Sequence, residues 1–306
     1  MKKLVATLML SLLLLGCAVG NKGLAAEKPL VVVSFYPLEY IVRVLAGDQL
    51  DLVNLSSGFD VHEYNLKPSD LVAISNASLF ISSGTVLEPW VNSLSIDNSS
   101  RQMQLAEALD FKLATADSHH HTEHEEHDEH DEDDADELVI DPHFWLDPNY
   151  MLQAAEAIAH QLQELGVMGV EDSLPMLKDR LDKLDTAFNV GLSDCKSRKL
   201  VVSHNAYSYL ADRYNLELIA VSGINSSDSP STSRLVELTE LVREYAISTI
   251  FLESTQAAKW AKTIAQETGV QTLELETVSY LRDKDSDYFD LQQANLENLK
   301  SGLECN

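Results

Sequence analysis

LVVVSF, at residues 30–35, is a short apolar run rich in β-branched side chains, which is typical of a buried strand. A helical stretch at residues 38–46 follows it and ends at Gly47. A second strand candidate at residues 50–55 is broken by the turn residues at 56–58. A strand, a helix and a strand in succession indicate a parallel sheet with helices on its faces. These residues therefore predict an α/β fold.

The same alternation continues to the carboxyl terminus. A further helix is predicted from Ser69 to about Asn76 and a strand at residues 79–82. Later strands are predicted at 200–203, 218–221, 249–252 and 270–275, and later helices at 150–165, 206–214, 231–245, 259–268 and 288–303. The chain thus has two halves with similar plans.

Between these halves, SLP at 173–175 is typical of a helix start with proline in the first turn. Apolar residues then recur at spacings of three and four up to Phe188, which predicts one apolar stripe on a helix of about twenty residues, about 30 Å long. This helix could join two lobes. We therefore predict a first lobe at 28–172, a linking helix at 173–194 and a second lobe at 195–306.

The amino terminus predicts an export signal at residues 1–17. Two lysines precede an apolar run that is too short to cross a bilayer of about 30 Å as a permanent helix. The ending LLGC at 14–17 resembles a lipobox, in which Cys17 would receive lipid and become the first mature residue. Ordinary cleavage near residues 23–26 is the alternative. Either route would place the folded protein outside the cytoplasmic membrane.

The composition limits the class of partner. The 306 residues carry a formal net charge of −27, from 49 acidic and 22 basic side chains. Such a surface repels phosphate backbones, so we expect no nucleic acid partner, and it favours cations. Three cysteines are too few for a four-cysteine zinc module. In an exported protein, Cys195 and Cys305 are free to pair, but the sequence leaves their separation open.

Residues 117–137 differ from the rest of the chain. They contain twelve acidic side chains, six histidines and no basic residue, which predicts a mobile loop without a packed core. The histidines are His119, His120, His121, His124, His127 and His130. Such a loop would bind zinc weakly and could collect ions as a secondary metal site, or it could be a solvated spacer.

Four other histidines remain, and three of them share a context. His62 follows a strand and a glycine break, His143 lies in a loop with prolines on both sides, and His204 lies where a strand meets a helix. Ligands gather beyond the carboxyl ends of strands in open α/β sheets, so we expect these three imidazoles to meet in one cleft as zinc ligands. His160 lies within a predicted helix, where a surface or packing role is expected.

Nearby carboxylates could orient these rings. Asp141 and Asp147 flank His143, and either could accept a hydrogen bond from the imidazole. Histidines at loop ends also simply cap helices, so each residue taken singly is a weak signal.

At these positions the sequence resembles the metal-binding receptors of bacterial ABC uptake systems that take up zinc or manganese. The resemblance covers nearly the whole chain after the export signal. It rests on several stretches in order, namely VSFYPL (33–38), DVHEY (60–64) with PSD (68–70), DPHFWLDP (141–148), SHNAYSYLA (203–211), IFLE (250–253) and AQETG (265–269).

The resemblance implies two Rossmann-like α/β lobes joined by one long helix, with the metal held in the cleft between them. It also implies a fourth ligand, usually an aspartate after the last strand of the second lobe. Counting back from Tyr288 and Asn295, which match the final helix of the family, places Glu276 at that position. Glu274 and water are the alternatives.

Three imidazoles and one carboxylate favour Zn²⁺ over Mn²⁺. The resemblance implies a receptor, not an enzyme, that delivers zinc to a membrane permease driven by a cytoplasmic ATPase, and we expect it to be a monomer. A zinc hydrolase could use three histidines, but the sequence has no His-Glu-x-x-His helix and no Gly-x-Ser-x-Gly elbow. A periplasmic zinc buffer or chaperone and a lipid-anchored adhesin could use the same site. Because zinc binds neutral imidazole, the affinity for zinc should decrease as the pH drops below about 6.5.

Overall fold

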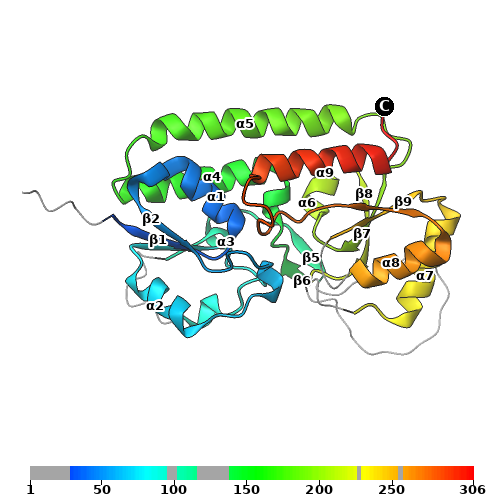
Figure 1. Ribbon diagram of the computed structural model, residues 1–306, viewed down its shortest axis with the longest axis horizontal. Coiled ribbons are helices and arrows are strands. Elements are labelled where there is room, and N and C mark those ends of the chain that lie inside the picture. The colour runs from blue at the N-terminus through cyan, green and yellow to red at the C-terminus, as the bar shows by residue number, and fades with distance from the viewer. Residues whose placement is uncertain (1–27, 95–101, 116–137, 226–228, 254–257) are drawn as a thin grey trace, which may run out of the picture.

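The computed structural model describes residues 28–94, 102–115, 138–225, 229–253 and 258–306. They form two α/β lobes side by side, with long helices lying along both (Figure 1). The α/β fold class predicted from the sequence is confirmed. Cys17 and the six histidines of residues 119–130 lie outside the described residues. Within the described ranges, no helix is long and apolar enough to cross a membrane.

The first lobe contains a four-stranded parallel sheet in the order β2-β1-β3-β4. Its strands are β1 (Leu30–Val33), β2 (Asp51–Asn54), β3 (Leu79–Ser82) and β4 (Gln102–Gln104). Its helices are α1 (Tyr36–Ala46), α2 (Pro68–Asn76), α3 (Leu105–Ala108) and α4 (Pro148–Glu164). The three valines of β1 are fully buried, because helices cover both faces of the sheet.

The second lobe repeats this plan with the strand order β10-β9-β7-β8, again all parallel. Its strands are β7 (Lys199–His204), β8 (Glu217–Ser222), β9 (Thr249–Leu252) and β10 (Gln271–Glu274). Its helices are α6 (Ser208–Arg213), α7 (Thr232–Glu244), α8 (Ala258–Thr268) and α9 (Tyr288–Gly302). In each sheet the first strand along the chain, β1 or β7, has the second strand on one side and the third strand on the other. Ligands of α/β proteins bind at the carboxyl end of the sheet where the strand order changes in this way.

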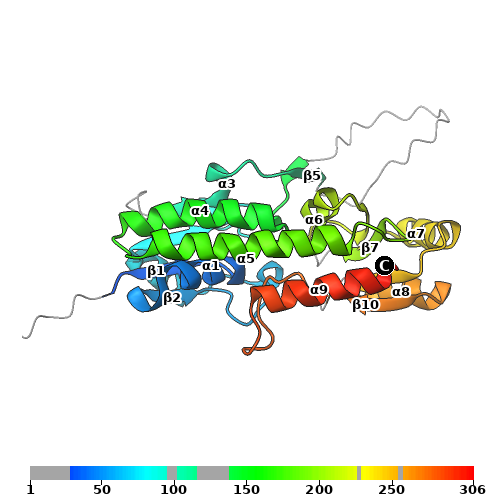
Figure 2. The same ribbon diagram turned by 90° about the horizontal axis from the view of Figure 1, so that it is seen from above.

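Two helices connect the lobes. Helix α5 (Val170–Gly191) extends along the first lobe and part of the second, and α9 runs beside it (Figures 1 and 2). The predicted start of α5 at Ser173 is wrong, because Gly169 adopts a left-handed conformation (φ 76°) and the helix begins directly after it. Pro175 therefore lies inside the helix and not in its first turn.

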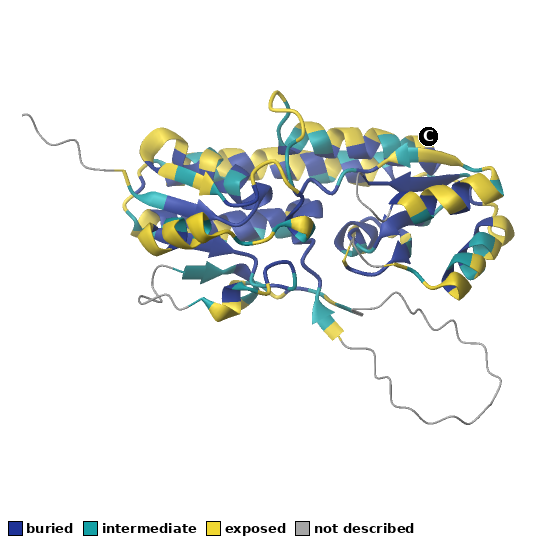
Figure 3. Cartoon of the chain, turned by 60° about the horizontal axis from the view of Figure 1, so that its bottom comes forward, coloured by how far each residue is buried: buried dark blue, intermediate teal, exposed yellow. Residues whose placement is uncertain are grey.

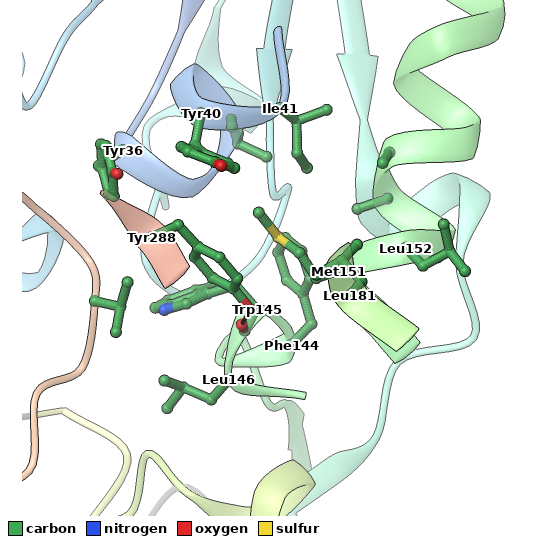
Figure 4. Close-up of a cluster of buried hydrophobic side chains, with 14 of the residues drawn as sticks. Tyr36, Tyr40, Ile41, Phe144, Trp145, Leu146, Met151, Leu152, Leu181 and Tyr288 are labelled. Atoms are coloured by element: carbon green, nitrogen blue, oxygen red, sulfur yellow. Dashed lines mark hydrogen bonds between the residues drawn. The ribbon is translucent and has the colours of Figure 1, made fainter. Parts of the chain in front are cut away.

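The first turn of α9 reaches the first lobe. The hydroxyl of Tyr288 donates to the carbonyl of Trp145 at 2.6 Å, and its ring lies 5.5 Å from that of Tyr40. Figure 4 shows these side chains in one apolar cluster with Phe144, Leu146 and Met151. The burial colours of Figure 3 show the same buried layer continuing from the first lobe to the junction. The lobes therefore share a core, and α5 is not their only connection.

The structure contains elements that the sequence pattern did not predict. β5 (Leu113–Thr115) and β6 (Leu138–Ile140) form an antiparallel hairpin, and its end residues Thr115 and Leu138 are paired. β4 and α3 were also not predicted. Cys195 and Cys305 form a disulfide that ties the end of the chain to the segment after α5.

Candidate metal centre

His62 and His143 are held by the same local arrangement. In each case an aspartate two residues earlier accepts a hydrogen bond from the backbone N–H of the histidine and also binds its ring Nδ1. The ring distances are 2.8 Å for Asp60 and His62, and 2.9 Å for Asp141 and His143. Each aspartate thereby fixes the ring orientation and the tautomer, with Nδ1 as donor and Nε2 as acceptor.

His204 comes from the second lobe, at the last position of β7. Its Nδ1 lies against Oε2 of Glu253, which follows β9, and the other carboxylate oxygen of Glu253 accepts from the Ser203 hydroxyl at 3.0 Å. The imidazole of His204 is fully buried, and its Nε2 has no hydrogen-bond partner in the described part of the chain. A buried nitrogen of this kind needs a ligand.

The three imidazoles converge. One nitrogen of each ring lies within 4.8 Å of the corresponding atoms of the other two, and Nε2 of His62 lies 3.2 Å from Nε2 of His143. With both Nδ1 atoms donating to aspartates, two lone pairs face each other at this distance, which is unfavourable without a cation between them. Nitrogen ligands of tetrahedral zinc, at 2.0–2.1 Å from the metal, are about 3.3 Å apart. The donor set therefore fits a zinc ion.

Burial and neighbouring charge act differently on the two innermost histidines. Burial lowers the pKa of His143 to about 4, despite the hydrogen bond with Asp141. Burial alone would also lower the pKa of His204, but the charge and the hydrogen bond of Glu253, together with the charges of Asp60 and Asp141, raise that pKa above its ordinary value. His143 is thus a neutral ligand near pH 7, whereas the metal must compete with a proton at His204.

Glu276, the expected fourth ligand, lies two residues after the end of β10, near enough to Glu253 for their charges to interact. Its carboxylate is paired with Arg282, whose Nη2 lies 2.9 Å from Oε1. Burial and a hydrogen bond with Glu274 raise the pKa of Glu276 to about 7. Glu274, the alternative, is more exposed and also binds Arg282. In the conformation described, the converging group consists of the three histidines without Glu276.

The remaining predicted residues have structural roles. Asp147 caps α4 by accepting from the backbone N–H of Asn149 at 2.7 Å and lies 3.3 Å from Arg213. It therefore positions α4 and not the ring of His143, which Asp141 alone orients. His160 is 69% exposed and lies near Glu164, so of the two expected roles, surface or packing, it has the surface role.

The orienting role of two acids was not inferred from the sequence. Asp60 and Glu253 both lie in stretches that resemble the metal-receptor family. Their contacts with His62 and His204, however, form only in the folded chain. The sequence signal for Asp60 was the repeated Asp-x-His spacing at 60–62 and 141–143. Asp141 also binds the second lobe, because its side chain accepts from the Ser208 hydroxyl and its carbonyl from Tyr209 at 2.9 Å.

Two α/β lobes with three buried imidazoles at their junction define a two-lobed metal-binding protein. Residues 31–302 match the family model described as ZnuA, zinc-uptake complex component A, periplasmic. The chain belongs to this family.

Individual relatives agree with the assignment. The zinc-binding protein AdcA of Streptococcus pyogenes is 29% identical over 290 residues, which are 90% of this chain and 56% of AdcA, so the chain spans about half of that relative. ZnuA of Bacillus subtilis, a high-affinity zinc uptake system protein, is 29% identical over 305 residues, which are 95% of this chain and 94% of ZnuA.

A solved structure shows the same architecture. The laminin-binding protein Lmb of Streptococcus agalactiae, described as an adhesin with metal-transporting activity, superposes with a TM-score of 0.78 at 26% identity. The match covers 90% of this chain and all of Lmb.

Proposed function

We propose that this protein is the extracytoplasmic zinc receptor of an ABC import system. The observation that carries the proposal is the convergence of His62, His143 and His204, each backed by its own carboxylate, at the junction of two lobes. Zinc would exchange its water shell for these nitrogens and link the lobes, because two ligands come from the first lobe and one from the second.

In the proposed zinc complex, Glu276 is the fourth ligand. Its proximity to Glu253 supports this, since that acid orients His204 and is near enough to influence the pKa of Glu276. The four ligands then come equally from the two lobes. The receptor would deliver its ion to a membrane permease driven by an ATPase.

The export signal and the acidic loop extend this proposal. Cys17 would carry a lipid that anchors the protein on the outer side of the cytoplasmic membrane, and mass spectrometry of the mature amino terminus would test this directly. The six loop histidines would collect zinc at low affinity near the receptor. Both proposals rest on sequence, because these residues lie outside the described ranges.

The other functions can be separated from this one. Membership of a zinc-uptake family argues against a hydrolase. A zinc buffer would use the same ligands but would bind no permease. An adhesin would bind a surface ligand, as the name of Lmb states for that protein and laminin. Pull-down of a permease by the zinc-loaded receptor, and not by the metal-free form, would favour the receptor.

Replacing His143 by alanine tests the metal centre. The tight zinc affinity should fall at least about tenfold, which is the low end for losing even a supporting group of a metal site. Competition with a chromophoric chelator measures this affinity. If less zinc than protein is present, the tight site fills before weaker sites do.

The matched control is His160→Ala, which removes an exposed imidazole from α4 and should leave the affinity unchanged. Circular dichroism would establish that both variants fold. An unaltered affinity in folded His143→Ala protein would refute the site.

A further inference from the structure

Arg282 lies on the segment after β10 and binds both acidic side chains beside the metal centre. Its Nη1 donates to Oε1 of Glu274 at 2.9 Å, and its Nη2 donates to Oε2 of Glu276 at 3.0 Å. Its third nitrogen, Nε, donates to the hydroxyl of Tyr280 at 3.1 Å. All three guanidinium nitrogens are therefore engaged, which fixes the plane of the group.

The backbone of Glu276 is held on several sides. The side-chain amide of Asn295 exchanges two hydrogen bonds of 2.8 Å with its N–H and carbonyl. On either side, the carbonyls of residues 275 and 277 accept from Tyr207 at 2.7 Å and from Trp145 at 2.6 Å. With the main chain pinned in this way, the position of the carboxylate depends on its side-chain rotamer and on its partner.

This part of the molecule needs a positive charge. Glu253, Glu274 and Glu276 all lie close enough for their charges to interact, and Glu276 is only 20% exposed. In the described conformation Arg282 is the cation that pairs with Glu274 and Glu276, whereas Glu253 lies against His204. A zinc ion bound to the three histidines would also supply positive charge to these carboxylates. Glu276 would then lie near two cations, the zinc ion and Arg282.

We propose that Arg282 is a positioning residue that holds the carboxylate of Glu276 in the metal-free protein and gives it up to zinc. The guanidinium and the metal then compete for one carboxylate, which limits the affinity and helps the ion to leave. This inference rests on the proposed zinc receptor function and on Glu276 as its fourth ligand.

The test compares zinc affinities of Arg282→Gln, Glu276→Gln and the double variant by chelator competition at pH 8. Arg282→Gln should bind zinc about fivefold more tightly, which corresponds to ~1 kcal/mol for a partly exposed ion pair. In the Glu276→Gln background the same change should have no effect, because the competition has been removed. Arg282→Lys keeps the charge without the fork and should fall between wild type and Arg282→Gln.

Lys284→Gln is the matched control, since it removes the same charge two residues away on the same segment and Lys284 has no ion pair within the described ranges. It should leave the affinity unchanged. A second measurement is thermal unfolding: Arg282→Gln should lower the midpoint of the metal-free protein but not that of the zinc-loaded protein.

Weaker or unchanged zinc binding by Arg282→Gln would overturn the inference, as would an equal effect in the Glu276→Gln background. These results leave the receptor proposal intact if wild-type protein binds zinc tightly and His143→Ala does not. If the wild-type protein itself did not bind zinc tightly, both the receptor proposal and the inference about Arg282 would be overturned.

Discussion

Acidification should release zinc through His204 and Glu276 and not through His143. Burial lowers the pKa of His204, but Glu253, Asp60 and Asp141 together raise it above its ordinary value, and burial raises the pKa of Glu276 to about 7. Burial holds the pKa of His143 at about 4. Between pH 6 and 5, the first two groups therefore carry protons in the metal-free protein, and His143 remains neutral.

The size of the effect follows from the number of displaced protons. Metal binds only the deprotonated ligand, so each proton that it displaces weakens binding about tenfold per pH unit, or ~1.4 kcal/mol. Displacement from both groups gives about a hundredfold, or ~2.7 kcal/mol, between pH 6 and 5. Above the pKa values of both groups the dependence should flatten, because neither then holds a proton.

Chelator competition at pH 5.0, 5.5 and 6.0 would measure the slope. Calorimetry in two buffers with different ionisation enthalpies would count the released protons independently. Glu276→Gln should lower the count by about one if this carboxylate is a ligand. An affinity that stays constant between pH 6 and 5 would refute the role of His204, and an unchanged count in Glu276→Gln would remove Glu276 from the ligand set.

Three further outcomes are expected. Deleting residues 118–136 should lower the zinc stoichiometry in a titration while the tight site keeps its affinity; loss of tight binding would contradict the junction site. Replacing Cys195 and Cys305 by serine opens a loop with a sequence separation of 110 residues and should lower the free energy of unfolding by about 4–5 kcal/mol in denaturant titrations. Trp145→Phe removes the donor to the carbonyl of Thr277 and should destabilise the protein by about 1–3 kcal/mol in the same assay, with an unchanged midpoint arguing against that hydrogen bond.

The repeated parts of the fold were predictable because their hydrophobic patterns are local. β3 and β9 occupy the predicted residues, and α1 ends at Gly47, whose φ of 53° favours glycine. Short elements were missed for the opposite reason. β4 consists of Gln-Met-Gln and has no apolar run, and the strands of the β5–β6 hairpin are separated by a long acidic segment.

The site was predictable in its residue types but not in its distances. His62, His143 and His204 follow strands or lie in a rigid loop, so their approach to one region could be expected from sequence. Their separation depends on how the two sheets pack, which no local pattern encodes. The pairing of Glu276 with Arg282 depends on how the chain bends between them, at residues 279–280, and likewise appears only in the folded chain.

The β5–β6 hairpin also affects how this protein can change over evolution. The acidic segment is flanked in the chain by two paired residues, Thr115 and Leu138, and Asp141 comes directly after the second strand. Each doubling of a closed loop adds only about 0.6 kcal/mol of closure entropy. As long as the pair of Thr115 and Leu138 is kept, a change in the length of the segment between them should therefore cost little closure entropy, and the same position is a candidate for inserting a reporter domain.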